Sequence, residues 1–443
     1  MENIGLIKAK LMQMPPAYTA VLCAMATFCI YVCTYSFRMG FTAGTYQGTS
    51  LLGIDFKVWL VMTQVAGYAM SKFIGIKFIA EIKPKGRARA ILVLLMIAWL
   101  ALLGFAIIPA PYNIICMFIN GLPLGLIWGL IFSYIEGRKS AEFIGAVLCT
   151  SFIFSSGVIK TIGRFMMAHG HVSEKWMPFL LGLLFVLPLF LFVYLLEQVP
   201  PPTAEDIKQR TQRLPMMAKE RKAFVKYFLA GLIFNIAIYI LLTVLRDFRD
   251  YFEVEIWSDF GYKNNPGIYS QIDIPISIIV LILMSLIILV KRNFRAFMLA
   301  HSSIGFGFLL IGIGSWEFIG GAIHGMTYMY MVTLGLYLAY VPYSIIFFER
   351  LIATFKYKSN VGFMIYLADS MGYLGSVCIL LFKQFGHTQL SWGSFFVHGA
   401  GLVSIIGIAG TGLSYLYFYR KKTRNIPQTT VASAIQKSGS YSM

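Results

Sequence analysis

Long apolar stretches repeated along the whole chain constrain this sequence more than any other feature. A helix that crosses a membrane needs about 20 mostly apolar residues, and twelve stretches of the 443-residue chain meet that requirement. They lie near 17–40, 57–80, 89–109, 112–135, 142–167, 176–196, 224–246, 270–290, 296–316, 325–348, 359–383 and 395–418. We therefore predict an all-α integral membrane protein with twelve transmembrane helices.

The composition excludes the soluble classes of protein. Hydrophobic residues make up 58% of the chain and charged residues only 13%, whereas soluble domains average about a quarter charged. A net charge of +18 would suggest nucleic-acid binding in a soluble chain. Here most of the 37 Lys and Arg fall in the tails and alternate loops, which is the pattern of cytoplasmic segments. We expect lipid neighbours, no nucleic acid and cytoplasmic termini; the basic residues expected outside are Lys57, Lys175, Arg249, Lys263 and Lys383.

The polar interval at the midpoint divides the chain into two halves. We predict an N-terminal six-helix half over 1–196, a basic cytoplasmic linker over 197–223, a C-terminal six-helix half over 224–418 and a cytoplasmic tail over 419–443. Two pseudo-symmetric six-helix halves joined by such a linker are typical of the major facilitator fold. Short outer loops without an Asn-x-Ser/Thr acceptor favour a bacterial inner membrane, and a monomer is compatible with the sequence.

Charged side chains inside the predicted spans are few and mostly positive. The basic ones are Arg38, Lys72, Lys77, Lys160, Arg164 and Arg246, and Asp369 is the acidic residue expected in mid-membrane. Each buried charge costs at least about 2.5–3.5 kcal/mol and needs a partner or a purpose. Six cations and one carboxylate cannot pair internally, so we expect some of the positive charge to reach water, lipid phosphate or an anionic ligand.

The depth of two arginines favours an anion site. Arg38 and Arg246 lie similarly deep in the first and seventh spans, which correspond in a two-repeat transporter. A guanidinium binds carboxylate or phosphate through two parallel hydrogen bonds, so two facing one space would form an anion clamp. The alternative for Arg246 is structural pairing with Asp247 or Asp250.

The other charges in the spans allow more than one interpretation. We expect Lys77 to reach the membrane surface along its aliphatic stem. Lys160 and Arg164 lie one turn apart on one helix face, and the sequence leaves open whether that face looks inward. Asp369 is either a counter-ion for Lys72 or an arginine, or a proton acceptor in a symport cycle.

Cofactor and enzyme chemistry have no support in the sequence. The six cysteines lie in apolar runs without metal-binding spacing, and the six histidines are scattered. No nucleophile–base pair or phosphate-binding glycine loop stands out. We predict neither a metal, a cofactor nor an enzymatic activity.

Four short motifs resemble the organophosphate:phosphate antiporters of the major facilitator superfamily. They are Tyr35-Ser36-Phe37-Arg38, Gly67-Tyr68 with Ser71-Lys72-Phe73, Val244-Leu245-Arg246, and Gly372-Tyr373-Leu374-Gly375. The resemblance implies that Arg38, Lys72 and Arg246 surround the phosphate of a substrate. The loop over 81–87 carries only a reduced form of the family's acidic-basic signature, and the helix-5 histidine of that family has no counterpart here. The chain therefore resembles a divergent relative.

These observations predict a secondary active transporter of a small organic anion, phosphorylated or carboxylated, that works by alternating access and is compatible with anion exchange. The predicted substrate-binding residues are Arg38, Lys72, Arg246, Lys160, Tyr68 and Tyr35. Alternatives are a proton-coupled symporter that uses Asp369, a membrane receptor with a transporter fold, and a flippase for anionic lipids.

Overall fold

The structure is a bundle of long helices. The computed structural model describes residues 6–81, 86–202, 206, 218–263, 265–355, 361–386 and 389–423. Within an apolar medium a helix satisfies every backbone polar group internally, which is why the long Leu-, Ile- and Phe-rich segments fold this way.

The first half consists of helices α2 to α7, preceded by a short helix. Its helical elements are α1 (Leu6–Met12), α2 (Pro16–Met39), the 3₁₀ turn η1 (Gly40–Ala43), α3 (Phe56–Glu81), α4 (Arg87–Ile107), α5 (Ile114–Ile135), α6 (Ala141–Ala168) and α7 (Met177–Gln198). A two-residue antiparallel hairpin of β1 (Ser50–Leu51) and β2 (Ile54–Asp55) connects η1 to α3.

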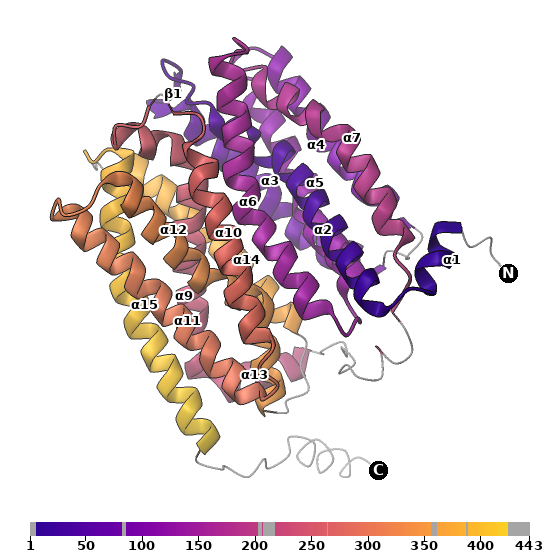
Figure 1. Cartoon of the computed structure of the whole chain (residues 1–443). Helices are drawn as coiled ribbons and strands as arrows, with labels where there is room; N and C mark the ends of the chain where they lie inside the picture. The colour runs from indigo at the N-terminus through magenta and orange to yellow at the C-terminus, as the bar shows by residue number, and fades with distance from the viewer. Residues whose placement is uncertain are drawn as a thin grey trace, which may run out of the picture.

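The second half consists of helices α9 to α15. Its elements are α9 (Ala218–Asp259), α10 (Ile268–Ile288), α11 (Asn293–Ile319), α12 (Gly325–Pro342), the π-helical turn η3 (Tyr343–Phe347), α13 (Phe348–Phe355), α14 (Val361–Phe385) and α15 (Trp392–Thr423). In Figure 1 the two halves lie side by side, with β1 at one end of the bundle and α1 and α13 at the other. We call these the hairpin end and the α13 end.

Ten helical segments of the described chain are long and apolar enough to cross a membrane. Helices α3 and α14, of 26 and 25 residues, coincide with the predicted second and eleventh spans. The chain is therefore a multi-pass, all-α membrane protein, and the count of twelve spans remains a prediction.

Close helix approaches depend on glycine. In the first half, α3 packs along α5, and a Cβ at Gly121 would lie 2.2 Å from the carbonyl oxygen of Gln64. Between the halves, α6 packs along α10, and a Cβ at Gly157 would lie 2.6 Å from the carbonyl oxygen of Tyr269. Helix α3 also contacts α14, and α6 contacts α12, so the halves meet along at least three helix pairs.

The prediction that the seventh span ends at residue 246 is wrong. Helix α9 continues to Asp259, with one non-helical residue at Phe252. The charged segment that was expected to be an outer loop is therefore helical, and Arg249, Asp250 and Glu253 are buried in it. The charges of this segment led to the prediction of a loop. They are compatible with a buried helix because α6 and α10 supply charged partners for them.

Candidate functional site

An ion pair joins the two halves midway along α3 and α14. Nζ of Lys72 lies 2.9 Å from Oδ2 of Asp369. The other oxygen of Asp369 accepts a hydrogen bond from the Tyr239 hydroxyl, which lies 3.0 Å from the Tyr340 hydroxyl. The Arg246 guanidinium donates a hydrogen bond to Tyr340 in turn. A continuous chain of polar contacts thus runs from Lys72 in the first half to Arg246 in the second.

Arg246 also has an acidic partner. Its Nε and Nη2 lie 3.1 and 2.7 Å from Oδ1 of Asp247, and the Ser376 hydroxyl donates to Oδ2 of the same residue at 2.8 Å. Of the two structural partners that the sequence offered for Arg246, the structure uses Asp247. Asp369 is likewise seen as the counter-ion of Lys72.

Arg38 differs from the other buried cations of α2, α3, α6 and α9. It is 7% exposed, and no carboxylate of the described chain lies within ion-pair distance of it. Its guanidinium lies 4.6 Å from the ring centroid of Tyr68 and 5.8 Å from that of Tyr35. The electron-rich ring faces attract the cation, and the hydroxyl of Tyr251 in α9 interacts with it as well. These neighbours of Arg38 are neutral side chains, so an anion can still balance its charge.

The three cations of the predicted phosphate site converge around Tyr373. The Tyr373 ring centroid lies 5.6 Å from Nζ of Lys72, and its hydroxyl interacts electrostatically with Arg38 and Arg246. The rings of Tyr373 and Tyr68 are 4.9 Å apart, so aromatic side chains from both halves pack here. We call this set the central network: Arg38, Lys72, Arg246, Asp247, Asp369, Tyr68, Tyr239, Tyr340 and Tyr373.

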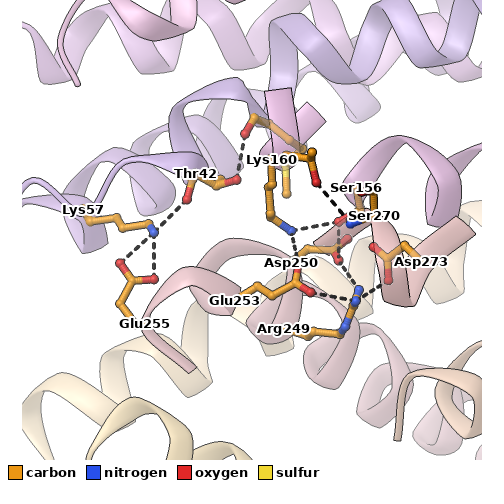
Figure 2. A network of polar contacts seen from close by, with 12 residues as sticks. Thr42, Lys57, Ser156, Lys160, Arg249, Asp250, Glu253, Glu255, Ser270 and Asp273 are labelled. Atoms are coloured by element: carbon orange, nitrogen blue, oxygen red, sulfur yellow. Dashed lines mark hydrogen bonds and ion pairs between the residues drawn. The ribbon is translucent and has the colours of Figure 1, made fainter. Parts of the chain in front are cut away.

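Figure 2 shows a second charged group, formed by α6, α9 and α10. We call it the acidic cluster; its members are Lys160, Arg249, Asp250, Glu253 and Asp273, all at most 2% exposed. Lys160 of α6 lies 2.7 Å from Glu253 and donates to the Ser156 hydroxyl at 2.8 Å. Arg249 of α9 contacts Asp250 at 3.2 Å, Glu253 at 2.9 Å and also Asp273 of α10. The cluster therefore ties α6 of the first half to α9 and α10 of the second.

Lys160 and Arg164 do not act together. The Lys160 ammonium faces Glu253 inside the acidic cluster, whereas Arg164 is partly exposed and donates to the Lys263 carbonyl at 3.4 Å. The side chain of Lys77 and most of the linker lie outside the described residues.

Sequence reasoning missed Arg249, Asp250, Glu253 and Asp273 as buried charges. A signal was present, because Arg249 and Glu253 are four residues apart and so share a helix face. Arg249 was expected in an outer loop. In the structure it lies in α9 and is fully buried. No group of three His, Cys, Asp or Glu side chains in the described part of the chain is arranged to hold a metal.

These buried acids also show that the expected surplus of positive charge in the spans is wrong. In the central network and the acidic cluster together, five cations are matched in number by five carboxylates: Arg38, Lys72, Lys160, Arg246 and Arg249 against Asp247, Asp250, Glu253, Asp273 and Asp369. The imbalance is local. The central network has three cations and two carboxylates, and the acidic cluster has two cations and three carboxylates.

Two further ion pairs join the halves at opposite ends. At the hairpin end, Nζ of Lys57 lies 2.7 and 2.8 Å from the carboxylate oxygens of Glu255 and donates to the Thr42 carbonyl at 3.0 Å. At the α13 end, Arg350 lies 2.8 Å from Glu142. The halves are thus in contact at both ends.

The fold is that of known membrane transporters. The chain is similar to a crystal structure of a D-xylose-proton symporter, with a TM-score of 0.58 and 13% identity over 90% of this chain and 97% of that one. It is similar to a mutant of the peptide transporter POT in complex with alafosfalin, with a TM-score of 0.57 and 13% identity over 90% and 94% of the two chains. These likenesses define the class as a major facilitator fold.

The sequence identifies the particular family. The chain belongs to the family of unknown function DUF5690, which it matches over residues 40–421. No curated protein matches the chain in sequence. The relation to the organophosphate:phosphate antiporters remains a prediction.

Proposed function

We propose that this protein is a secondary active transporter of a small organic anion, phosphorylated or carboxylated, that works by alternating access. The observation that carries the proposal is the Arg38 guanidinium. It is buried at the interface of the halves without a carboxylate of the described chain as partner. A buried charge of this kind is costly unless something compensates it, and a bound anion provides that compensation.

The neighbours of Arg38 suggest how an anion is held. An anion on Arg38 also comes under the field of Lys72 from the first half and Arg246 from the second, because all three converge around Tyr373. A ligand that draws on cations of both halves favours the state in which they are together. Tyr35 and Tyr68 offer ring faces beside Arg38 for the organic part.

The remaining predicted residues take supporting roles. The two oxygens of Asp369 accept hydrogen bonds from Lys72 and Tyr239. This supports a role for Asp369 as the counter-ion that neutralises and positions Lys72. Lys160 is occupied by Glu253 and Ser156, so it serves the contact between halves in this proposal. We assign the chain to a bacterial inner membrane with cytoplasmic termini on the distribution of Lys and Arg.

Exchange follows from the same electrostatics. An empty central network retains one uncompensated cation in a low-dielectric environment, which disfavours the passage of the empty carrier between its two states. A carrier of this kind reorients faster when loaded, and therefore exchanges one anion for another.

The test uses purified full-length chain and three sets of probes: phosphorylated metabolites, carboxylates and lysolipids. A ligand thermal-shift screen identifies the class that binds, and counterflow in proteoliposomes measures exchange. We expect Arg38→Ala to lose affinity about 10- to 100-fold, because a hydrogen bond to a charged group is worth about 1.5–3 kcal/mol. Arg38→Lys should retain part of the affinity.

The matched control is Arg164→Ala, which removes an arginine that is partly exposed and bound only to a backbone carbonyl. It should bind and exchange like the wild type. Full exchange by Arg38→Ala would overturn the anion site, and stabilisation by lysolipids alone would favour the flippase instead.

A further inference from the structure

The acidic cluster carries one more carboxylate than it has cations. Lys160 and Arg249 face Asp250, Glu253 and Asp273, and all five side chains are at most 2% exposed. A net negative charge enclosed in protein and lipid is strongly disfavoured, and a group in that position usually neutralises instead. One proton on one carboxyl balances the cluster.

The hydrogen bonds indicate which carboxyl takes it. Both oxygens of Glu253 accept from cations, Oε1 from Arg249 and Oε2 from Lys160. Asp250 accepts two hydrogen bonds on Oδ1, from Arg249 and from the Ser156 hydroxyl. Asp273 accepts from Arg249 on Oδ1 only, and its buried Oδ2 has no hydrogen-bond partner. A carboxylate with a single hydrogen bond and a fully buried bare oxygen is the least stabilised of the three.

We propose that Asp273 binds a proton on Oδ2 and that this proton stabilises the state of the transport cycle in which the hairpin end is closed. Oδ1 then acts as the carbonyl oxygen and keeps its bond from Arg249. The Tyr337 hydroxyl of α12 is also buried without a partner and interacts electrostatically with Asp250 and Asp273.

The position of the cluster connects this proton to the movement of the halves. The groups that face Asp273 come from three elements. Helix α6 brings Lys160 and Ser156, α9 brings Arg249, Asp250 and Glu253, and α12 brings Tyr337. At Gly157 the two halves touch, since a Cβ there would lie 2.7 Å from Cβ of Asp273. The site is therefore dry only while α6 and α10 are together.

The proton balance follows from that geometry. When the hairpin end closes, one proton moves from water to Oδ2 of Asp273. When α6 leaves α10, Lys160 is withdrawn from Glu253, water reaches the carboxyl, and the proton returns to water. Because the closed state holds one more proton than the open state, acid favours closure. This inference rests on alternating access as proposed above, but not on the identity of the anion.

Infrared spectroscopy of the full-length chain in lipid nanodiscs tests the site. We expect the C=O stretch of a buried carboxylic acid at neutral pH, its loss in Asp273→Asn, and its retention in Asp369→Asn. Asp273→Glu should restore a shifted band and shows that the position accepts an acid. Persistence of the band in Asp273→Asn would overturn the assignment.

Electron–electron distance measurements test the coupling. Spin labels at Leu52 and Leu390, which are 83% and 42% exposed near the hairpin end, report its opening in a Cys378→Ser background. The closed population should grow as pH falls in the wild type, and should be independent of pH in Asp273→Asn. A wild-type distance distribution that does not change with pH would overturn the proposed link between protonation and closure. Neither readout uses an anion, so both remain decisive if the Arg38 site fails.

Discussion

The central network and the acidic cluster are built from the same residue types but are unbalanced in opposite directions. In the central network Arg38 is left over after Lys72 and Arg246 take Asp369 and Asp247. In the acidic cluster the two cations Lys160 and Arg249 face three carboxyl groups, so one carboxyl has no cation to balance it. A leftover cation suits an anionic substrate, and a leftover carboxylate suits a proton.

The difference also explains why the two sites can work together. Bound anion and bound proton neutralise both imbalances at once, so the fully loaded carrier holds no uncompensated charge in either site. A carrier loaded at one site only retains a charge at the other. The charge pattern thus gives a physical reason for anion and proton to bind in the same closed state.

The largest effect should come from removing a lysine from each site. Lys160→Met leaves one cation for three carboxylates in a fully buried place, and breaking such a pair costs about 3–5 kcal/mol. Lys72→Met leaves the central network with equal numbers of each charge, and Asp369 keeps its bond from Tyr239 and is 14% exposed. We expect a smaller loss there, about 1–2 kcal/mol.

Reversible unfolding in mixed micelles, followed by tryptophan fluorescence, measures both losses. The double variant Lys160→Met/Glu253→Gln removes a cation and an acid together and should recover part of the stability. Equal losses for the two lysine variants would show that the charge balance of a site does not decide its tolerance.

Removing an acid from each site should give effects of opposite sign. Asp369→Asn increases the excess of positive charge around Lys72 and should destabilise the fold by about 1–3 kcal/mol. Asp273→Asn removes the excess acid and should leave stability unchanged at low pH. Wild-type Asp273 holds a proton in the fold that the unfolded chain releases, so wild-type stability falls as pH rises. The stability of Asp273→Asn relative to wild type should therefore rise with pH.

Unfolding curves of both variants across a pH series check the sign. The asparagine side chain keeps the shape of the carboxyl in each case, so packing changes are matched. A variant Asp273→Asn that loses stability as much as Asp369→Asn at every pH would contradict the proposed protonation.

Much of the architecture could be predicted from the sequence, because the length and polarity of spanning helices are set by the membrane itself. The multi-pass helical fold followed from that constraint, and the polar linker between two sets of spans indicated the major facilitator fold. The end of α9 did not: a run such as Asp247, Arg249, Asp250 and Glu253 is typical of a solvated loop unless its partners are known. Those partners, Lys160 and Asp273, come from helices far away in the sequence.

The candidate site shows the same limit. The types and depths of Arg38, Lys72 and Arg246 indicated a shared location, because span number and depth are encoded locally. The distinction between a paired and an unpaired arginine depends on neighbours such as Tyr340 and Tyr68. Which side chains become partners across an interface depends on how the two halves pack, so the local sequence around each residue does not predict it.

The smallest effect should come from the balanced pair Lys57–Glu255, which serves as a reference for both unbalanced sites. It has one charge of each sign, and Glu255 is 15% exposed although Lys57 is buried. Water can therefore reach the carboxylate that Lys57→Met leaves behind, and the loss should be about 1 kcal/mol. That is about a fivefold shift in a two-state equilibrium.

Because the Lys57–Glu255 pair holds the hairpin end together, the Leu52–Leu390 distance distribution of Lys57→Met should move toward the open state. Arg350→Gln releases the α13 end instead and should move the same distribution toward the closed state. Shifts in the same direction from both variants would mean that these pairs stabilise the fold as a whole and do not hold opposite ends of an alternating-access cycle.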